Sequence, residues 1–280
     1  QFLKALCEYF RSSNAYVANI QDADILIYNS YDFKSAITSY RLAGQLKLQK
    51  GTRLVVVHRV DGPIAVVRGN ARSLIVDRSI CLFNQKIADA TVYQSEWSRK
   101  ICEGFGIASN QPWSIIPNAC SPKLFFPKLT NSSSHKIRIV ATSWSANWRK
   151  GFDIYRYLDR HLNFDRYEMT FIGNSPIQFS NIKKISPLSS HDLSEALRQY
   201  DLYITASADD PCSNSLIEAL SCGLPVVARN SGGHPELVGK GGLLFNDQRD
   251  VLSTIDVCAN SLEHFRNKIV IPRIEDIGSR

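Results

Sequence analysis

The sequence feature that most constrains the fold is a strand–loop–helix–strand pattern within residues 202–228. The apolar run 202–205 predicts a buried strand, and Pro211 breaks the chain after it. Residues 213–215 (Ser-Asn-Ser) are good N-cap types, Gly223 is a typical helix stop, and a second apolar strand follows directly. A helix joined to two apolar strands by such short segments predicts a parallel α/β sheet.

The start of this helix is suited to bind an anion. A helix that begins at residues 213–215 presents free backbone N–H groups and the positive end of its dipole there. Asp210 lies in the loop before the helix, and Glu218 lies one turn inside it. A structural interpretation stays open, because Ser215 and Glu218 also have the spacing of a capping box.

Strands and helices alternate along the rest of the chain. We expect a helix at 1–18, a strand at 23–28, a helix at 33–50, a strand at 54–57, a helix at 68–88, a strand at 90–93, a helix at 95–105 and a strand at 113–116. After a polar, turn-rich segment at 127–135 we expect a strand at 137–141, a helix at 151–162, a strand at 167–172 and a helix at 193–200. The predicted fold class is therefore α/β, with two Rossmann-like parallel-sheet lobes, 1–128 and 129–280, that face a cleft.

Composition narrows the class of protein. No apolar run approaches the length of a membrane span, and the seven cysteines are scattered without metal-ligand spacing. We therefore expect a cytoplasmic protein with reduced thiols, including the case of a peripheral protein at the inner face of the membrane.

The net charge of +7 lies entirely in the first lobe, which contains 16 Lys and Arg residues and 9 Asp and Glu residues. Such asymmetry favours an acidic partner, namely an anionic acceptor, an anionic membrane surface or nucleic acid. Nucleic acid is the weakest of these, because no nucleic-acid-binding motif is present. A merely solvated basic surface remains the alternative.

The acidic pair and its surroundings resemble the retaining glycosyltransferases of family 4, the glycosyl transferases group 1 proteins, which have the GT-B fold. Their motif is Glu, seven residues, Glu, a small-residue helix and Gly-x-Pro-Val-Val. Asp210 and Glu218 stand at the acidic positions, and residues 230–238 resemble the family's Gly-Gly-x-Pro-Glu-Leu-Val segment. The chain departs from the family at Asp210, where Glu is usual.

The resemblance implies a GT-B fold with an acceptor-side lobe at 1–128 and a nucleotide-sugar donor lobe at 129–280. Members usually begin with a strand and a glycine-rich loop, so it also implies that the first lobe is truncated at its N-terminus. The implied function is metal-independent hexosyl transfer from a nucleotide-diphosphate sugar to a glycan, lipid or small molecule, as in cell-surface glycan biosynthesis. The donor is a substrate, and no cofactor is expected.

The resemblance also assigns roles to residues of the second lobe. Glu218 would hold the ribose hydroxyls, and Asp210 would orient the sugar and face developing positive charge. The leaving diphosphate would be held by Lys150 and the N–H groups of Ser213, Asn214 and Ser215. The family's upstream Arg position holds Ser143 here, and Arg149 is assigned in its place. Gly233 would allow close approach of the donor, and residues 185–188 would wrap the nucleobase.

In the first lobe the resemblance places His58 against the donor sugar, after the strand 54–57. Asn118 resembles the Asn of the family's Pro-Asn-Gly and is interpreted mainly as a turn residue. No metal site is expected, because the one Asp-x-Asp, at 22–24, precedes its strand instead of following it.

Structural interpretations of these residues stay open. A lone histidine at a strand end is more often structural, and an Arg-Lys pair before a helix can be an ordinary solvated cap. Two rival functions also remain: glycoside hydrolysis by Asp210 and Glu218, and non-catalytic binding of a nucleotide sugar.

Overall fold

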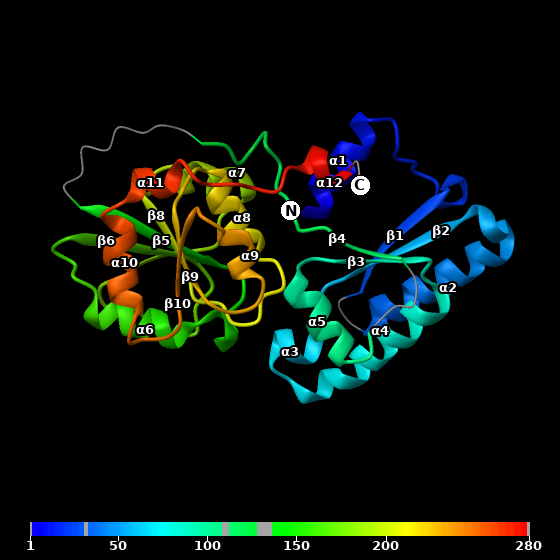
Figure 1. The fold of residues 1–280 in the computed structure, drawn as a ribbon, viewed down its shortest axis with the longest axis horizontal. Helices are drawn as coiled ribbons and strands as arrows, with labels where there is room; N and C mark the ends of the chain where they lie inside the picture. Colours follow the sequence, from blue (N-terminus) through cyan, green and yellow to red (C-terminus); the bar gives the residue numbers. More distant parts are fainter. Residues whose placement is uncertain (1, 31–32, 108–111, 128–135, 279–280) are drawn as a thin grey trace. The chain divides into compact units, whose positions relative to one another are not determined.

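The protein is described by a computed structural model covering residues 2–30, 33–107, 112–127 and 136–278. The chain divides into two compact units, which we call the N-terminal unit (Cys7–Pro117) and the C-terminal unit (Gln1–Leu6 with Asn118–Arg280). Each unit contains one parallel sheet with helices packed against it (Figure 1). This confirms the predicted α/β class with two parallel-sheet lobes.

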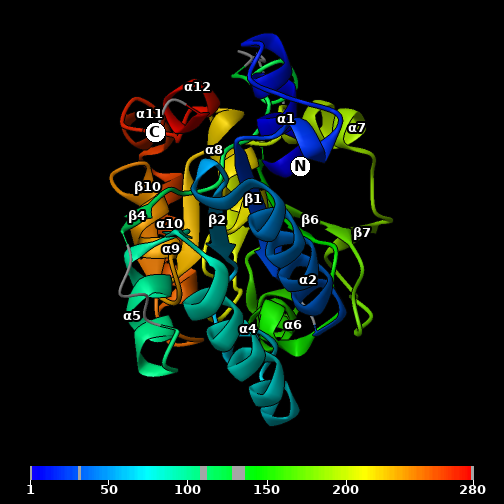
Figure 2. The same ribbon diagram turned by 90° about the vertical axis from the view of Figure 1, so that its right-hand side faces the viewer.

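The sheet of the N-terminal unit has the strand order β1-β2-β3-β4. Its strands are β1 (Ile25–Ser30), β2 (Val55–Val60), β3 (Ala90–Tyr93) and β4 (Trp113–Ile115). The helices of this unit are α2 (Phe33–Lys50), α3 (Ile64–Arg68), α4 (Leu74–Ile87) and α5 (Glu96–Gly104), and helix α1 (Phe2–Ser12) includes the division between the units at Cys7. Helices α2 and α4 pack side by side (Figure 2). Leu46, Val56 and Ile87 form part of the buried core beneath them.

The sheet of the C-terminal unit has the strand order β10-β9-β8-β5-β6-β7. Its strands are β5 (Ile137–Ser143), β6 (Tyr167–Gly173), β7 (Lys183–Ile185), β8 (Leu202–Thr205), β9 (Val226–Arg229) and β10 (Gly242–Phe245). Its helices are α6 (Phe152–His161), α7 (Ser190–Leu197), α8 (Asn214–Ser221), α9 (His234–Val238), α10 (Val251–Ala259), α11 (Leu262–Arg266) and α12 (Ile274–Gly278). The order is that of a doubly wound Rossmann-like sheet.

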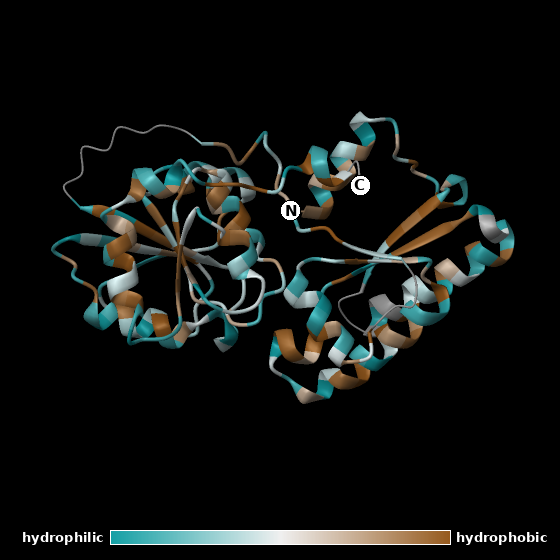
Figure 3. Ribbon diagram, viewed as in Figure 1, coloured by the Kyte–Doolittle hydropathy of each residue, from teal (hydrophilic) through white to brown (hydrophobic). Residues whose placement is uncertain are grey.

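Helices cover both faces of this second sheet, so its strands are apolar on both sides. Alternate residues of β5 point to opposite faces, so that Ile139 joins the core under α6 and α10 while Val140 joins the core under α7, α8 and α9. In Figure 3 the strands β1 and β2 of the first sheet are also strongly hydrophobic, and the helices carry both colours. In that sheet, however, Ile25, Ile27 and Val55 are exposed, so the described residues do not cover the face on which they lie.

The sequence predicted most elements, and four differences have physical reasons. Strand β7 was missed because its short segment begins with two exposed lysines, and β10 was missed because it begins within the Gly pair 241–242. The expected helix 68–88 is interrupted at Gly69, whose φ of 62° is left-handed and ends α3. Strand β2 extends to Val60 instead of ending at residue 57.

The division between the units lies at Asn118, whereas the sequence placed it at residue 129. Residues after Asn118 pack on the C-terminal unit, where Cys120 and Phe125 belong to the core around α8. The predicted polar linker at 127–135 falls almost wholly on residues 128–135, which lie outside the described part of the chain.

Candidate functional site

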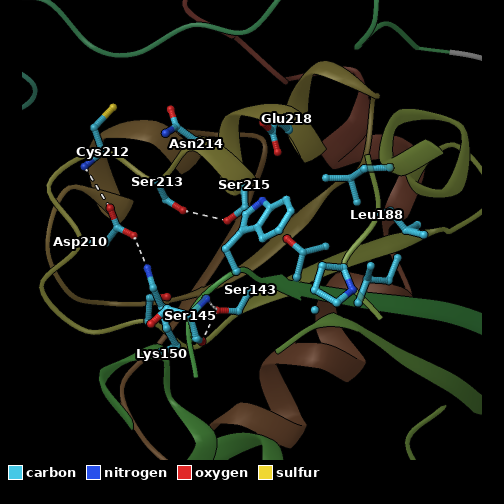
Figure 4. A pocket seen from close by; sticks show the side chains of 17 residues that line it. Ser143, Ser145, Lys150, Leu188, Asp210, Cys212, Ser213, Asn214, Ser215 and Glu218 are labelled. Carbon is cyan, nitrogen blue, oxygen red and sulfur yellow. Dashed lines mark hydrogen bonds and ion pairs between the residues drawn. The ribbon is translucent and has the colours of Figure 1, made fainter. Parts of the chain in front are cut away.

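A pocket of about 220 Å³ lies at the carboxyl edge of the C-terminal sheet. It is lined by the loop after β5, the loop after β8 and the start of α8 (Figure 4). Strands β5 and β8 are neighbours whose chain connections lead away in opposite directions. In doubly wound sheets, ligands bind at this switch point, outside the carboxyl ends of the strands.

Lys150 lies in the loop after β5, and a glycine fixes its position. Gly151 has a φ of 83°, and a Cβ there would lie 2.2 Å from the Ala206 carbonyl oxygen at the end of β8. Only a glycine at this position allows the loop after β5 to contact the end of β8 so closely. This contact brings Lys150 to the loop after β8, where its Nζ lies 3.1 Å from Oδ2 of Asp210.

Asp210 is held on its backbone and on its side chain. Its carbonyl oxygen accepts a hydrogen bond of 2.9 Å from the Gly233 N–H, and its Oδ1 accepts one of 3.3 Å from the Cys212 N–H. Gly232 permits this approach, because a Cβ there would lie 2.4 Å from the Asp210 carbonyl oxygen. Burial alone would raise the pKa of Asp210, but the Lys150 ammonium and the hydrogen bonds hold that pKa below its usual value.

Glu218 lines the same pocket from α8. It is only 5% exposed, and burial raises its pKa to about 7. Within the described residues its carboxylate has no hydrogen-bond or ion-pair partner. The capping box with Ser215 is not formed, since the N-cap of α8 is Ser213, whose Oγ accepts from the Leu216 N–H. A buried carboxylate without a partner among the described residues is suited to bind ligand hydroxyls.

The first turn of α8 supplies an anion site. The backbone N–H groups of Ser213, Asn214 and Ser215 have no partner within the described chain, and all three residues line the pocket. They lie at the positive end of the dipole of α8. Figure 4 shows these residues with Lys150 and Asp210 toward one side of the pocket and Leu188 on the other. Pro187 and Leu188, from the segment predicted to wrap the nucleobase, both line it.

Two predicted donor-binding residues do not line this pocket. Arg149 forms an ion pair with Asp209, so its guanidinium is turned to that carboxylate. Gly233 contributes its N–H to the Asp210 carbonyl and acts on the site through the backbone. Their predicted contacts with the donor stay predictions.

The structure corrects the placement of His58. Because β2 continues to Val60, His58 lies within the strand and not after it. It is completely buried, stacked on the Tyr28 ring with a 4.3 Å centroid distance and 2.9 Å from the Asn84 amide nitrogen. Burial lowers its pKa to about 3. The prediction assumed a histidine at a strand end, whereas the residue lies in a buried environment that keeps the ring neutral. Its predicted contact with the donor sugar stays a prediction.

Asn118 has a larger role than the turn that the sequence suggested. Its buried Nδ2 donates to the Cys212 carbonyl at 3.1 Å and to Oδ1 of Asn214 at 2.9 Å, and its N–H contacts the Cys212 Sγ at 3.2 Å. These bonds fix the chain where α8 begins. The partners are 94 and 96 residues away, so no local spacing indicates them.

We predict that Asn118→Ala weakens the binding of a nucleoside diphosphate about tenfold and destabilises the protein by about 1–3 kcal/mol, because buried acceptors at the start of α8 lose their donor. Calorimetric titration and urea unfolding measure the two effects. Asn181→Ala, which removes an amide bonded to the Asp159 carbonyl remote from the pocket, is the control that should spare ligand binding. Equal binding losses in both variants would contradict the prediction.

No three His, Cys, Asp or Glu side chains in the described part come together as a metal-binding cluster. No described helix is both long and apolar enough to cross a membrane.

Comparison with known proteins places this geometry in context. Residues 156–270 match the protein family described as Glycosyl transferases group 1. Sulfoquinovosyl transferase SQD2 of Arabidopsis thaliana is 32% identical over 91 residues, which are 28% of this chain but only 18% of that protein.

Solved structures extend the likeness in fold to nearly all of the chain. HepE of Anabaena in complex with UDP-glucose has a TM-score of 0.67 at 15% identity, over 98% of this chain and 77% of that one. Sucrose-phosphate synthase from Thermosynechococcus elongatus has a TM-score of 0.71 at 17% identity, over 99% of this chain and 75% of that one. The chain therefore has the GT-B fold, and its residues 156–270 match the model of the glycosyl transferases group 1 family.

Proposed function

We propose that this protein transfers a sugar from a nucleotide-diphosphate sugar to an acceptor hydroxyl, with retention of the anomeric configuration and without a metal ion. The observation that carries the proposal is the pocket at the switch point. It combines the Lys150 ammonium, the N–H groups at the start of α8, and the carboxylates of Asp210 and Glu218. A nucleotide sugar presents a diphosphate, a ribose and a hexose, and this pocket has a suitable group for each.

Each residue then has a role that its surroundings support. Lys150 and the N–H groups of residues 213–215 stabilise the negative charge that develops on the leaving diphosphate, as preorganised donors do. Ionised Glu218 accepts hydrogen bonds from the ribose hydroxyls. Asp210 accepts hydrogen bonds from the hexose hydroxyls and faces the positive charge that develops on the sugar. Because a cation and a helix terminus neutralise the diphosphate, the reaction needs no metal.

The same pocket disfavours glycoside hydrolysis. A hydrolase needs two carboxylates on either side of a glycosidic bond. Here Asp210 is paired with a lysine and lies beside unpaired N–H groups that suit an anion. A substrate without phosphate would leave this part of the pocket unused.

The choice of nucleotide and acceptor also belongs to the proposal. HepE, which shares the fold, has been observed with UDP-glucose and with UDP and glucose, so UDP is the first nucleotide to test. The excess positive charge of residues 1–128 supports an anionic glycan or a lipid-linked acceptor. The match to sulfoquinovosyl transferase covers less than a fifth of that protein, and its activity is no guide to the acceptor.

Calorimetric titration with UDP-, GDP- and ADP-glucose tests the proposal, followed by an assay for nucleoside diphosphate release with and without EDTA. We expect micromolar to millimolar binding of one donor and slow release that EDTA does not abolish. Binding without any transfer or donor hydrolysis would favour the non-catalytic binding module. Turnover of a nitrophenyl glycoside in place of the nucleotide sugar would favour the hydrolase.

A further inference from the structure

Lys150 is the one cationic side chain among the described residues that line the pocket, and it already has a partner. Its Nζ lies 3.1 Å from Asp210 Oδ2, with the two side chains 34% and 15% exposed. A diphosphate that enters the pocket must therefore compete with Asp210 for the ammonium group.

Among the described residues that line the pocket, no second cation can bind the diphosphate or neutralise Asp210. Arg149, the neighbouring residue, pairs with Asp209, so the two loops are joined by two parallel ion pairs, 149–209 and 150–210. His234 lies near Asp210 and is completely buried, and its Nδ1 donates to the Arg229 carbonyl. Burial lowers the pKa of His234, so the ring is neutral and its Nε2 is an acceptor that cannot donate to Asp210.

If a phosphate draws Lys150 away, the Asp210 carboxylate retains, within the described residues, only the 3.3 Å hydrogen bond from the Cys212 N–H. Removing the counter-charge from a mostly buried carboxylate costs free energy. A bound hexose offsets this cost because its hydroxyls donate hydrogen bonds to the carboxylate. A nucleoside diphosphate without a sugar lacks the hexose hydroxyls that would donate hydrogen bonds to Asp210.

On the basis of the proposed function, we propose that the Lys150–Asp210 ion pair makes the pocket select nucleotide sugars over free nucleoside diphosphates. Binding of the donor exchanges partners, with Lys150 moving to the diphosphate and Asp210 to the hexose hydroxyls. After transfer the sugar is gone, Asp210 takes Lys150 back, and the diphosphate is released. The pair thus limits product inhibition.

The test is calorimetric titration of wild type and Asp210→Asn with UDP, GDP and ADP and with the glucose conjugate of each. Asparagine keeps the shape of the side chain but leaves Lys150 without its counter-charge. We expect the variant to bind the nucleoside diphosphate about tenfold more tightly than wild type does. The affinity for the glucose conjugate should not increase. The dissociation constant of the diphosphate divided by that of the conjugate should therefore fall about tenfold. Asp210→Glu should restore the wild-type ratio.

Asp201→Asn is the matched control. Asp201 precedes β8, whereas Asp210 follows it, and its Oδ1 lies 3.1 Å from the Arg138 guanidinium. The control makes the same change in net charge within the same unit. It should leave the affinity for the diphosphate within about twofold of wild type, because it frees no group in the pocket. Tighter binding in both variants would attribute the effect to overall charge and overturn the proposal.

The remaining outcomes are separable. If wild type binds a nucleotide sugar while Asp210→Asn binds the diphosphate no more tightly than wild type, this proposal fails and the proposed function stands. If wild type binds none of the conjugates, the proposed function fails and takes this proposal with it. Circular dichroism checks the folding of each variant. If Asp210→Asn does not fold, Asp210→Ser should show the same tighter binding of the nucleoside diphosphate.

Discussion

Glu218→Gln should bind nucleotide sugars at least about tenfold more weakly than wild type and yet unfold at a higher temperature. The loss of binding follows because an ionised carboxylate accepts hydrogen bonds from two ribose hydroxyls more strongly than an amide oxygen does. The gain in stability follows because Glu218 is buried without a partner in the described chain, and its pKa is raised to about 7.

The pH dependence has a definite sign. The unfolded chain ionises this group near its ordinary value of 4.5, whereas the folded protein holds the proton up to about pH 7. Between these values the folded state binds more protons, so Glu218 makes the protein less stable as the pH rises through this window. Above pH 7 the full penalty applies, on the order of 3 kcal/mol, and glutamine removes it.

Thermal unfolding of wild type and Glu218→Gln at pH 4.5 and pH 8 measures this effect. The difference in melting temperature should be large at pH 8 and small at pH 4.5. Glu168→Gln, at an exposed position of β6, is the control that should change neither stability nor binding. A stability gain that is the same at both pH values, or unchanged donor binding, would contradict the assignment.

Lys150→Ala should lower the rate of diphosphate release from a nucleotide sugar about 10²–10³-fold. Lys150 is the one cation lining the described pocket, so its loss leaves the N–H groups of α8 alone to stabilise the leaving group. The variant also leaves Asp210 without a counter-charge, so its donor affinity should fall as well. Release can be measured with water as the acceptor, which needs no knowledge of the natural acceptor.

A double-mutant cycle with Asp210→Asn sharpens this prediction. Because Lys150 and Asp210 act as a pair, the double variant should lose far less than the two single losses combined. Lys183→Ala, at an exposed position of β7, is the charge-matched control and should keep full activity. Wild-type turnover by Lys150→Ala would remove the basis of the proposed function.

The sequence predicted those parts of the site that depend on local spacing. The order of strand, loop, N-cap and glycine stop specifies β8 and α8 within a few residues, and with them the positions of Asp210 and Glu218. The Rossmann-like alternation followed from the apolar runs, because strands covered on both faces must be apolar on both.

Features that depend on distant pairing were not predictable. The ion pair between Arg149 and Asp209 joins residues 60 positions apart, and this pairing turns Arg149 from the pocket. His58 was misplaced because Val-rich runs do not show where a strand ends, and β2 continues past it. Asn118 looked like a turn residue because its partners near α8 are known only from the fold.

The close contact of Gly151 with Ala206 has a consequence for how the site responds to solution conditions. Steric fit of backbone against backbone does not weaken with added salt, whereas attraction between charges does. Lys150 should therefore keep its place at high ionic strength, even where its ion pair is screened. A fall in donor affinity with salt would then report weakened attraction alone, with the geometry of the phosphate site intact.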